Sequence, residues 1–113
     1  IIITNKKRTI MKTIQRGTDL MIWLALNFDP KQVKDFSIKY FTHLDEEHAH
    51  VVTLADGIIK SEGTYLALLP SQELDKVGRG QLVSIVTITR EDFNFPDKNN
   101  NENIKQFLDI WLK

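Results

Sequence analysis

The residues best suited to metal chemistry lie in the polar segment from His43 to His50. His48 and His50 stand two residues apart, so in a strand their imidazoles share one face. Imidazoles together with carboxylates are accepted ligands of zinc and nickel. A functional site also needs a third fixed ligand and oriented partners, but the acids at 45–47 fall in a predicted solvated turn. We therefore predict no metal and no other cofactor, with His48 and His50 as the candidate ligands if a metal binds.

Other catalytic motifs find little support in the sequence. Gly78-Arg79-Gly80 precedes a predicted strand, whereas phosphate-binding Gly-x-Gly loops lead into a helix. None of the serines is framed as Gly-x-Ser-x-Gly, and the chain has no cysteine to act as a thiolate nucleophile or to form a disulfide. No spacing recommends a catalytic triad or a pair of acids. We predict that the protein is not an enzyme.

Four residues are candidates for contact with a partner: Arg16, Asp19, Trp23 and Trp111. Gly17 permits a positive φ just before the first long apolar run. Arg16 and Asp19 flank that glycine, and they either pair locally or face a partner. The two tryptophans are large apolar surfaces of the kind that anchor interfaces, although in a small β-domain such residues also serve in the core.

The length and composition of the chain are typical of one soluble globular domain. It has 113 residues, and its 15 Lys plus Arg balance 15 Asp plus Glu. A neutral chain gives no bulk electrostatic reason to expect nucleic acid or an anionic membrane as partner. Met11 opens a natural-looking start, so we treat residues 1–10 as an extension and 11–113 as one domain. The extension is an upstream read, a processed leader or a native segment.

The hydrophobic pattern predicts an all-β fold. Residues 18–26 alternate with Leu20, Ile22, Leu24 and Leu26 on one face, as expected for a strand above a core. Asp56-Gly57 carries the signature of a tight hairpin. Short β-favouring runs separated by turn residues predict strands at 18–26, 36–41, 48–54, 58–60, 64–69, 81–89 and 104–112.

Three segments need separate interpretation. Pro70 and Ser71 predict one short helical turn near 71–76, with Ser71 as its cap. Residues 93–103 contain Pro96-Asp97 and an asparagine run, which predicts an exposed loop. The final segment fits a helix or a strand, and we favour a strand because a nine-residue terminal helix is marginal. About seven short strands at regular spacing predict an immunoglobulin-like β-sandwich.

Several motifs carry a resemblance to a known family. They are IQRGTDL at 14–20, EGTYLAL at 62–68, SQELDKVGRGQL at 71–82 and DFNFPD at 92–97. From residue 11 onward their order resembles the immunoglobulin-like domain of tail and baseplate structural proteins of tailed bacteriophages, including the amino-terminal domain of upper baseplate proteins. The opening MKTIQRGTD is also similar to small proteins of Bacteroidetes phages and prophages.

The resemblance implies a non-enzymatic structural or adaptor protein of a virion, in a tail, baseplate or collar. Its expected partners are other virion structural proteins, in a homo-oligomer or a symmetric hetero-assembly, with no nucleic acid and no membrane. Its expected location is the virion, after synthesis in the bacterial cytoplasm. The alternative is a carbohydrate or cell-surface binding module that uses residues such as Trp23, His48, His50 and Trp111. A small hydrolase or metalloprotein is the third hypothesis.

Overall fold

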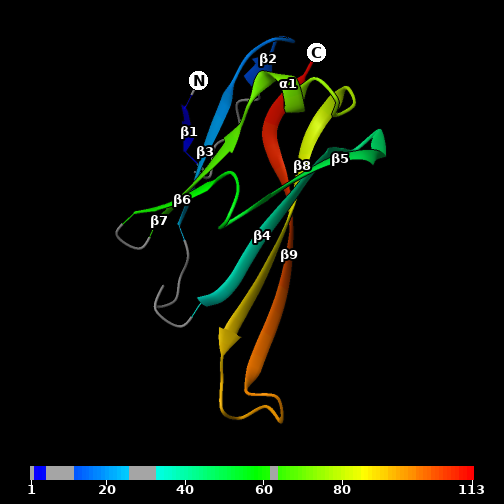
Figure 1. Ribbon diagram of the computed structural model, residues 1–113. Helices are drawn as coiled ribbons and strands as arrows, with labels where there is room; N and C mark the ends of the chain where they lie inside the picture. The colour runs from blue at the N-terminus through cyan, green and yellow to red at the C-terminus, as the bar shows by residue number, and fades with distance from the viewer. Residues whose placement is uncertain (1, 5–11, 26–32, 62–63) are drawn as a thin grey trace.

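The protein is built almost entirely of β-strands that form two sheets (Figure 1). The structure, a computed structural model, describes residues 2–4, 12–25, 33–61 and 64–113. Within these residues the strands are β1 (Ile2–Thr4), β2 (Lys12–Ile14), β3 (Leu20–Ala25), β4 (Val33–Thr42), β5 (Asp45–Thr53), β6 (Ile58–Ser61), β7 (Thr64–Leu69), β8 (Gly80–Glu91) and β9 (Asn99–Leu112). A single helical turn, α1 (Ser71–Leu74), lies between β7 and β8. The prediction of an all-β fold is confirmed.

The two sheets have four and five strands among the described residues. Their orders are β1-β3-β7-β6 and β2-β9-β8-β4-β5. All seven predicted segments form strands, β3 to β9. The predicted number was too low, because β1 and β2 are short strands that pair in parallel with β3 and β9. Three-residue strands are too short for alternation to reveal them.

The core lies between the two sheets. Leu20, Ile22 and Leu24 of β3 are buried on one side, as the alternation predicted. From the five-stranded sheet, β4 contributes its alternate residues, of which Phe36 is fully buried. The rings of Phe36 and Tyr65 stack with centroids 4.8 Å apart, which joins β4 directly to β7 of the other sheet. Apolar side chains from both sheets therefore form one continuous core.

The predicted hairpin at Asp56-Gly57 is wrong. β5 belongs to the five-stranded sheet and β6 to the four-stranded sheet, so this turn carries the chain from one sheet to the other. Thr53 and Asp56 exchange backbone hydrogen bonds of 2.8 and 3.1 Å, which close the turn. The antiparallel hairpin is formed instead by β6 and β7. An Asp-Gly pair specifies a turn but not which sheet receives the next strand.

The predicted loop over residues 93–103 is too long. β9 begins at Asn99, and Asn101 and Asn103 lie opposite Thr89 and Thr87 of β8. Each threonine hydroxyl donates to the asparagine across from it, at 2.9 and 2.8 Å. The asparagine run predicted a loop because asparagine is rare in strands. In this hairpin the cross-strand bonds give the asparagine amide oxygens their hydrogen-bond donors. The strand prediction for 104–112 is confirmed, and β8 with β9 forms a long hairpin ending in the loop at 92–98 (Figure 1).

The segment that precedes β3 is hydrogen-bonded to α1 and to Asp75, which follows α1. Ser71 was predicted to cap α1, but the N-cap position is Pro70 and no side-chain cap comes from within the helix. Instead the Ser71 N–H donates to Asp19 Oδ1 at 2.7 Å. The Gly17 N–H donates to Asp75 Oδ1 at 3.0 Å, with Gly17 at φ 85° as predicted. Two carboxylates thus join two segments more than fifty residues apart.

Candidate interaction surface

The outer face of the five-stranded sheet carries an apolar cluster that the core does not use. Phe41 and Val83 are 2% and 0% exposed, yet they lie opposite each other on the side of the sheet away from the core. Around them Val51, Phe107 and Trp111 remain 52%, 58% and 38% exposed. An exposed apolar cluster on one side of a sheet is typical of an interaction site.

Two lysines complete this surface. Lys39 Nζ and Lys105 Nζ lie 5.7 and 5.9 Å from the centre of the Phe41 ring, and Lys105 Nζ lies 5.6 Å from the centre of the Phe107 ring. Cation–π contacts of this kind are worth about 0.5–1 kcal/mol each at exposed sites. We call the surface formed by Lys39, Phe41, Val51, Val83, Lys105, Phe107 and Trp111 the aromatic–lysine face.

The charge on this face is predominantly positive. Among the described residues, neither Lys39 nor Lys105 takes part in a salt bridge. The two lysines outnumber Asp109, which is exposed on β9 between Phe107 and Trp111. Two ammonium groups near one ring repel each other, so an anionic group placed between them is attracted by both.

His43 fixes the end of the face where Trp111 lies. The two rings are 5.6 Å apart, centre to centre. His43 Nδ1 accepts the Gln81 N–H at 2.9 Å, so the neutral imidazole carries its proton on Nε2. Gly80 has φ 124°, and a Cβ at that position would lie 2.9 Å from His43 Cε1. Only glycine both adopts this backbone conformation and leaves room for the imidazole.

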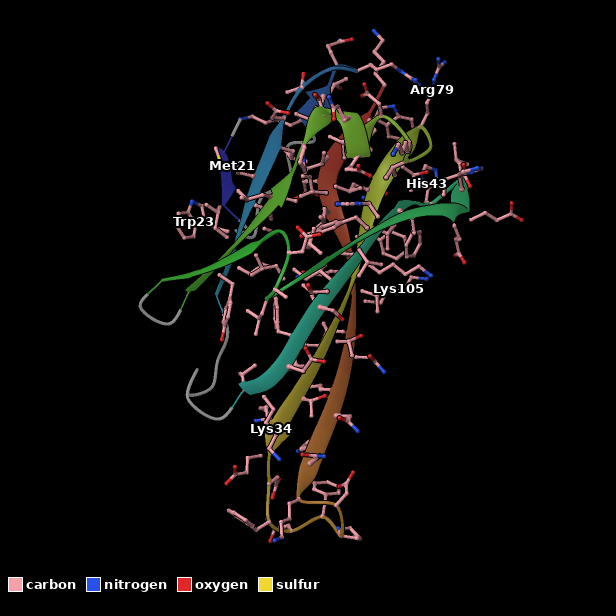
Figure 2. All side chains as sticks on the ribbon, viewed as in Figure 1. Met21, Trp23, Lys34, His43, Arg79 and Lys105 are labelled. Atoms are coloured by element: carbon pink, nitrogen blue, oxygen red, sulfur yellow. The ribbon has the colours of Figure 1, made fainter. Side chains whose placement is uncertain are left out.

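The structure separates the predicted contact residues. Trp111 lies on the aromatic–lysine face, whereas Trp23 lies partly buried in β3 of the other sheet. Figure 2 shows Met21 and Trp23 on the opposite side of the molecule from His43 and Lys105. Arg16 is exposed beside a depression of about 20 Å³, which has room for about one water molecule.

Asp19 makes a contact within the chain, through its bond to the Ser71 N–H. That contact holds Asp19 against the first residue of α1. Its predicted role in an interface stays a prediction, as do those of Arg16, Trp23 and Trp111.

The two candidate metal ligands have separate acidic partners. His48 Nδ1 lies 2.8 Å from Asp45 Oδ2, whereas His50 Nδ1 lies 3.7 Å from Glu73 Oε2. The hydrogen bond with His48 holds the pKa of Asp45 below its ordinary value of 3.8. The acids at 45–47 begin β5, so the predicted turn was misplaced. Within the described ranges no group of three or more potential ligands is placed to hold a metal ion.

Two tyrosines, Tyr40 and Tyr65, have buried hydroxyls. Among the described residues, the hydroxyls of Tyr40 and Tyr65 are buried without a hydrogen-bond partner. Burial raises the pKa of both hydroxyls above the ordinary value of 10.0. Both groups therefore stay protonated at neutral pH.

Sequence reasoning missed most of the aromatic–lysine face. It named Trp111 but not Phe41, Phe107, Lys39 or Lys105. The available signal was the apolar character of both faces of the strand at 81–89, where Val83 and Ile85 alternate with core residues. That signal indicates that the second face is covered, without saying by what.

Comparisons of the chain with protein-family models, with curated proteins and with solved structures find no match. The resemblance to phage baseplate domains therefore remains a prediction from the sequence motifs. Within the part of the chain that the structure describes, no helix has the length and apolar character needed to cross a membrane.

Proposed function

We propose that this protein is a non-enzymatic assembly domain that binds another protein surface through the aromatic–lysine face. The observation that carries the proposal is the exposed pair Phe107 and Trp111 beside two lysines without ion-pair partners among the described residues. Aromatic side chains at the centre of a patch supply most of the binding energy of protein interfaces. The expected partner surface is apolar with carboxylates placed to meet Lys39 and Lys105.

The strand order supports the immunoglobulin-like relationship that forms part of this proposal. In immunoglobulin domains one sheet contains strands B, E and D, and the other contains G, F, C and, in the variable type, C′. β3-β7-β6 and β9-β8-β4-β5 follow the same orders. The proposed setting, a tail, baseplate or collar of a phage particle, rests on the sequence resemblance, and repeated copies in such particles bury apolar faces between subunits.

Site-specific cross-linking tests this proposal. A photo-reactive phenylalanine analogue replaces Phe107 in the cells that make the protein, and the same analogue replaces exposed Gln72 of α1 as a control. We expect a discrete cross-linked protein from position 107, identified by mass spectrometry, and none from position 72. Lys105→Glu combined with the analogue at 107 should reduce the yield several-fold, because it reverses the charge beside the ring.

The carbohydrate alternative is favoured by one observation, the half-exposed Trp111 ring on an open sheet face. A glycan array separates the two functions. Binding that is lost in Trp111→Ala, without a cross-link from position 107, would replace our proposal. An assembly domain should give no glycan signal, either as the wild type or as Trp111→Ala.

A further inference from the structure

A second exposed apolar feature lies at the end of the β8–β9 hairpin. Residues 92–98, which we call the hairpin tip, connect the two strands far from α1 (Figure 1). Phe93 and Phe95 are 72% and 45% exposed there. Exposing two phenylalanine rings to water on one short loop is unfavourable. A surface that covers these rings would therefore bind the loop favourably.

The hairpin tip is held in one conformation by its own hydrogen bonds. The Asp92 N–H donates to the Lys98 carbonyl and the Lys98 N–H donates to the Phe95 carbonyl, both at 2.9 Å. The Asn94 N–H donates to Asp92 Oδ1 at 3.0 Å. Lys98 has φ 62°, and its Nζ lies 5.9 Å from the centre of the Phe93 ring. A loop ordered in advance loses little entropy when it binds.

The charges of the hairpin tip complement those of the aromatic–lysine face. The tip, residues 92–98, contains the two acids Asp92 and Asp97 and the one lysine Lys98, which gives a net charge of −1. Each surface therefore combines exposed aromatic rings with charges of the sign that the other attracts.

We infer that the hairpin tip of one copy docks on the aromatic–lysine face of a second copy. This inference rests on the proposed function of that face and names its partner. The two phenylalanines of the tip would pack on Phe107 and Trp111, and the acids of the tip would meet Lys39 and Lys105.

The same charges argue against a face-to-face dimer. A two-fold axis would place the lysines of one copy against those of the other, and such like-charge contacts cost several kcal/mol. Docking of a tip on a face occurs either twice about a different two-fold axis, which gives a closed dimer, or head-to-tail, which gives a ring or a filament. The inference thus predicts assemblies of two or more copies at high concentration.

Mixing two variants of the full chain tests the inference. The tip variant is Phe93→Ser with Phe95→Ser, and the face variant is Phe107→Ser. All three side chains are exposed, so folding should be retained and is checked by circular dichroism. In sedimentation velocity we expect the wild type to form concentration-dependent oligomers. Each variant alone should bind itself at least about 30-fold more weakly, the effect of losing one interface hot spot.

An equimolar mixture of the two variants separates a specific tip-to-face contact from non-specific association. The face variant keeps its tip and the tip variant keeps its face, so an equimolar mixture should form a dimer that contains one copy of each. Leu44→Ser, at a site 70% exposed on the turn between β4 and β5, is the matched control and should assemble like the wild type.

Three results would overturn the inference: a wild type that stays monomeric at millimolar concentration, a tip variant that assembles normally, or a mixture without the dimer. The second result, or a cross-link from position 107 to a different protein, would leave the proposed function standing.

Discussion

Replacing Asp19 by alanine tests whether the tie between β3 and the α1 corner stabilises the fold. The carboxylate accepts the N–H of Ser71, the first residue of α1, at 2.7 Å and from 52 residues away in the sequence. The bond is exposed, so the released N–H returns to water and no buried donor is left without a partner. We therefore expect the loss of an ordinary hydrogen bond, about 1 kcal/mol.

Thermal unfolding followed by circular dichroism measures this loss. For a domain of this size about 1 kcal/mol lowers Tm by about 4 °C. Asp19→Asn keeps a neutral acceptor and should lose less. Glu46→Ala removes another exposed carboxylate and should leave Tm unchanged.

A double-mutant cycle with Asp75→Ala adds a sharper criterion. Asp75 accepts the Gly17 N–H at 3.0 Å, so both carboxylates hold the same pair of segments. If the segments separate only when both ties are lost, the two effects are coupled by about 0.5 kcal/mol or more. An unchanged Tm in Asp19→Ala, or strictly additive effects of the two substitutions, would refute the reasoning.

Three further predictions concern single side chains. Tyr40→Phe removes a buried hydroxyl that has no partner among the described residues, so urea unfolding should show a stability between unchanged and about 1 kcal/mol higher; a clear loss would reveal a hidden partner. Gly80→Ala introduces a Cβ at φ 124° and 2.9 Å from His43 Cε1, so it should cost about 2 kcal/mol in the same assay, and full stability would contradict the assigned backbone conformation. His48→Gln should raise the pKa of Asp45 toward 3.8 in an NMR titration. Because the folded pKa of Asp45 is depressed, its contribution to stability is present above pH 3.8 and is lost as the pH falls through the folded pKa. An unmoved Asp45 titration would contradict this pairing.

Alternation of apolar residues predicted the core well. Leu20, Ile22 and Leu24 share the buried face of β3, and the next strand likewise buries Phe36 and its alternate neighbours. This success has a simple cause, since a strand with one buried face must place its apolar residues two apart. Neither tie through Asp19 or Asp75 leaves such a local signal, because each joins segments distant in sequence.

Sheet membership was not predictable from local patterns. The Asp56-Gly57 turn is real, but the next strand joins the other sheet, where Ile58 pairs with Ala67 of β7. Strand pairing is decided by which distant partner offers a complementary register and core contact. Likewise, the asparagine run of β9 has low β-propensity, and its strand form depends on threonines of β8 that a single segment does not contain.

When a strand has apolar residues on both faces, its sequence does not show what covers the second face. The aromatic–lysine face is an example. Phe41 and Val83 are fully buried although no second layer of described strands covers them. Lys39 Nζ and Lys105 Nζ lie over the Phe41 ring, 5.7 and 5.9 Å from its centre. In the proposed contact these lysines meet the carboxylates of the docking copy, while its phenylalanines pack on Phe107 and Trp111. Lys105 thus contacts Phe41 in the isolated chain and a carboxylate in the proposed contact. Charge reversal at Lys105 should therefore weaken assembly more than it alters folding.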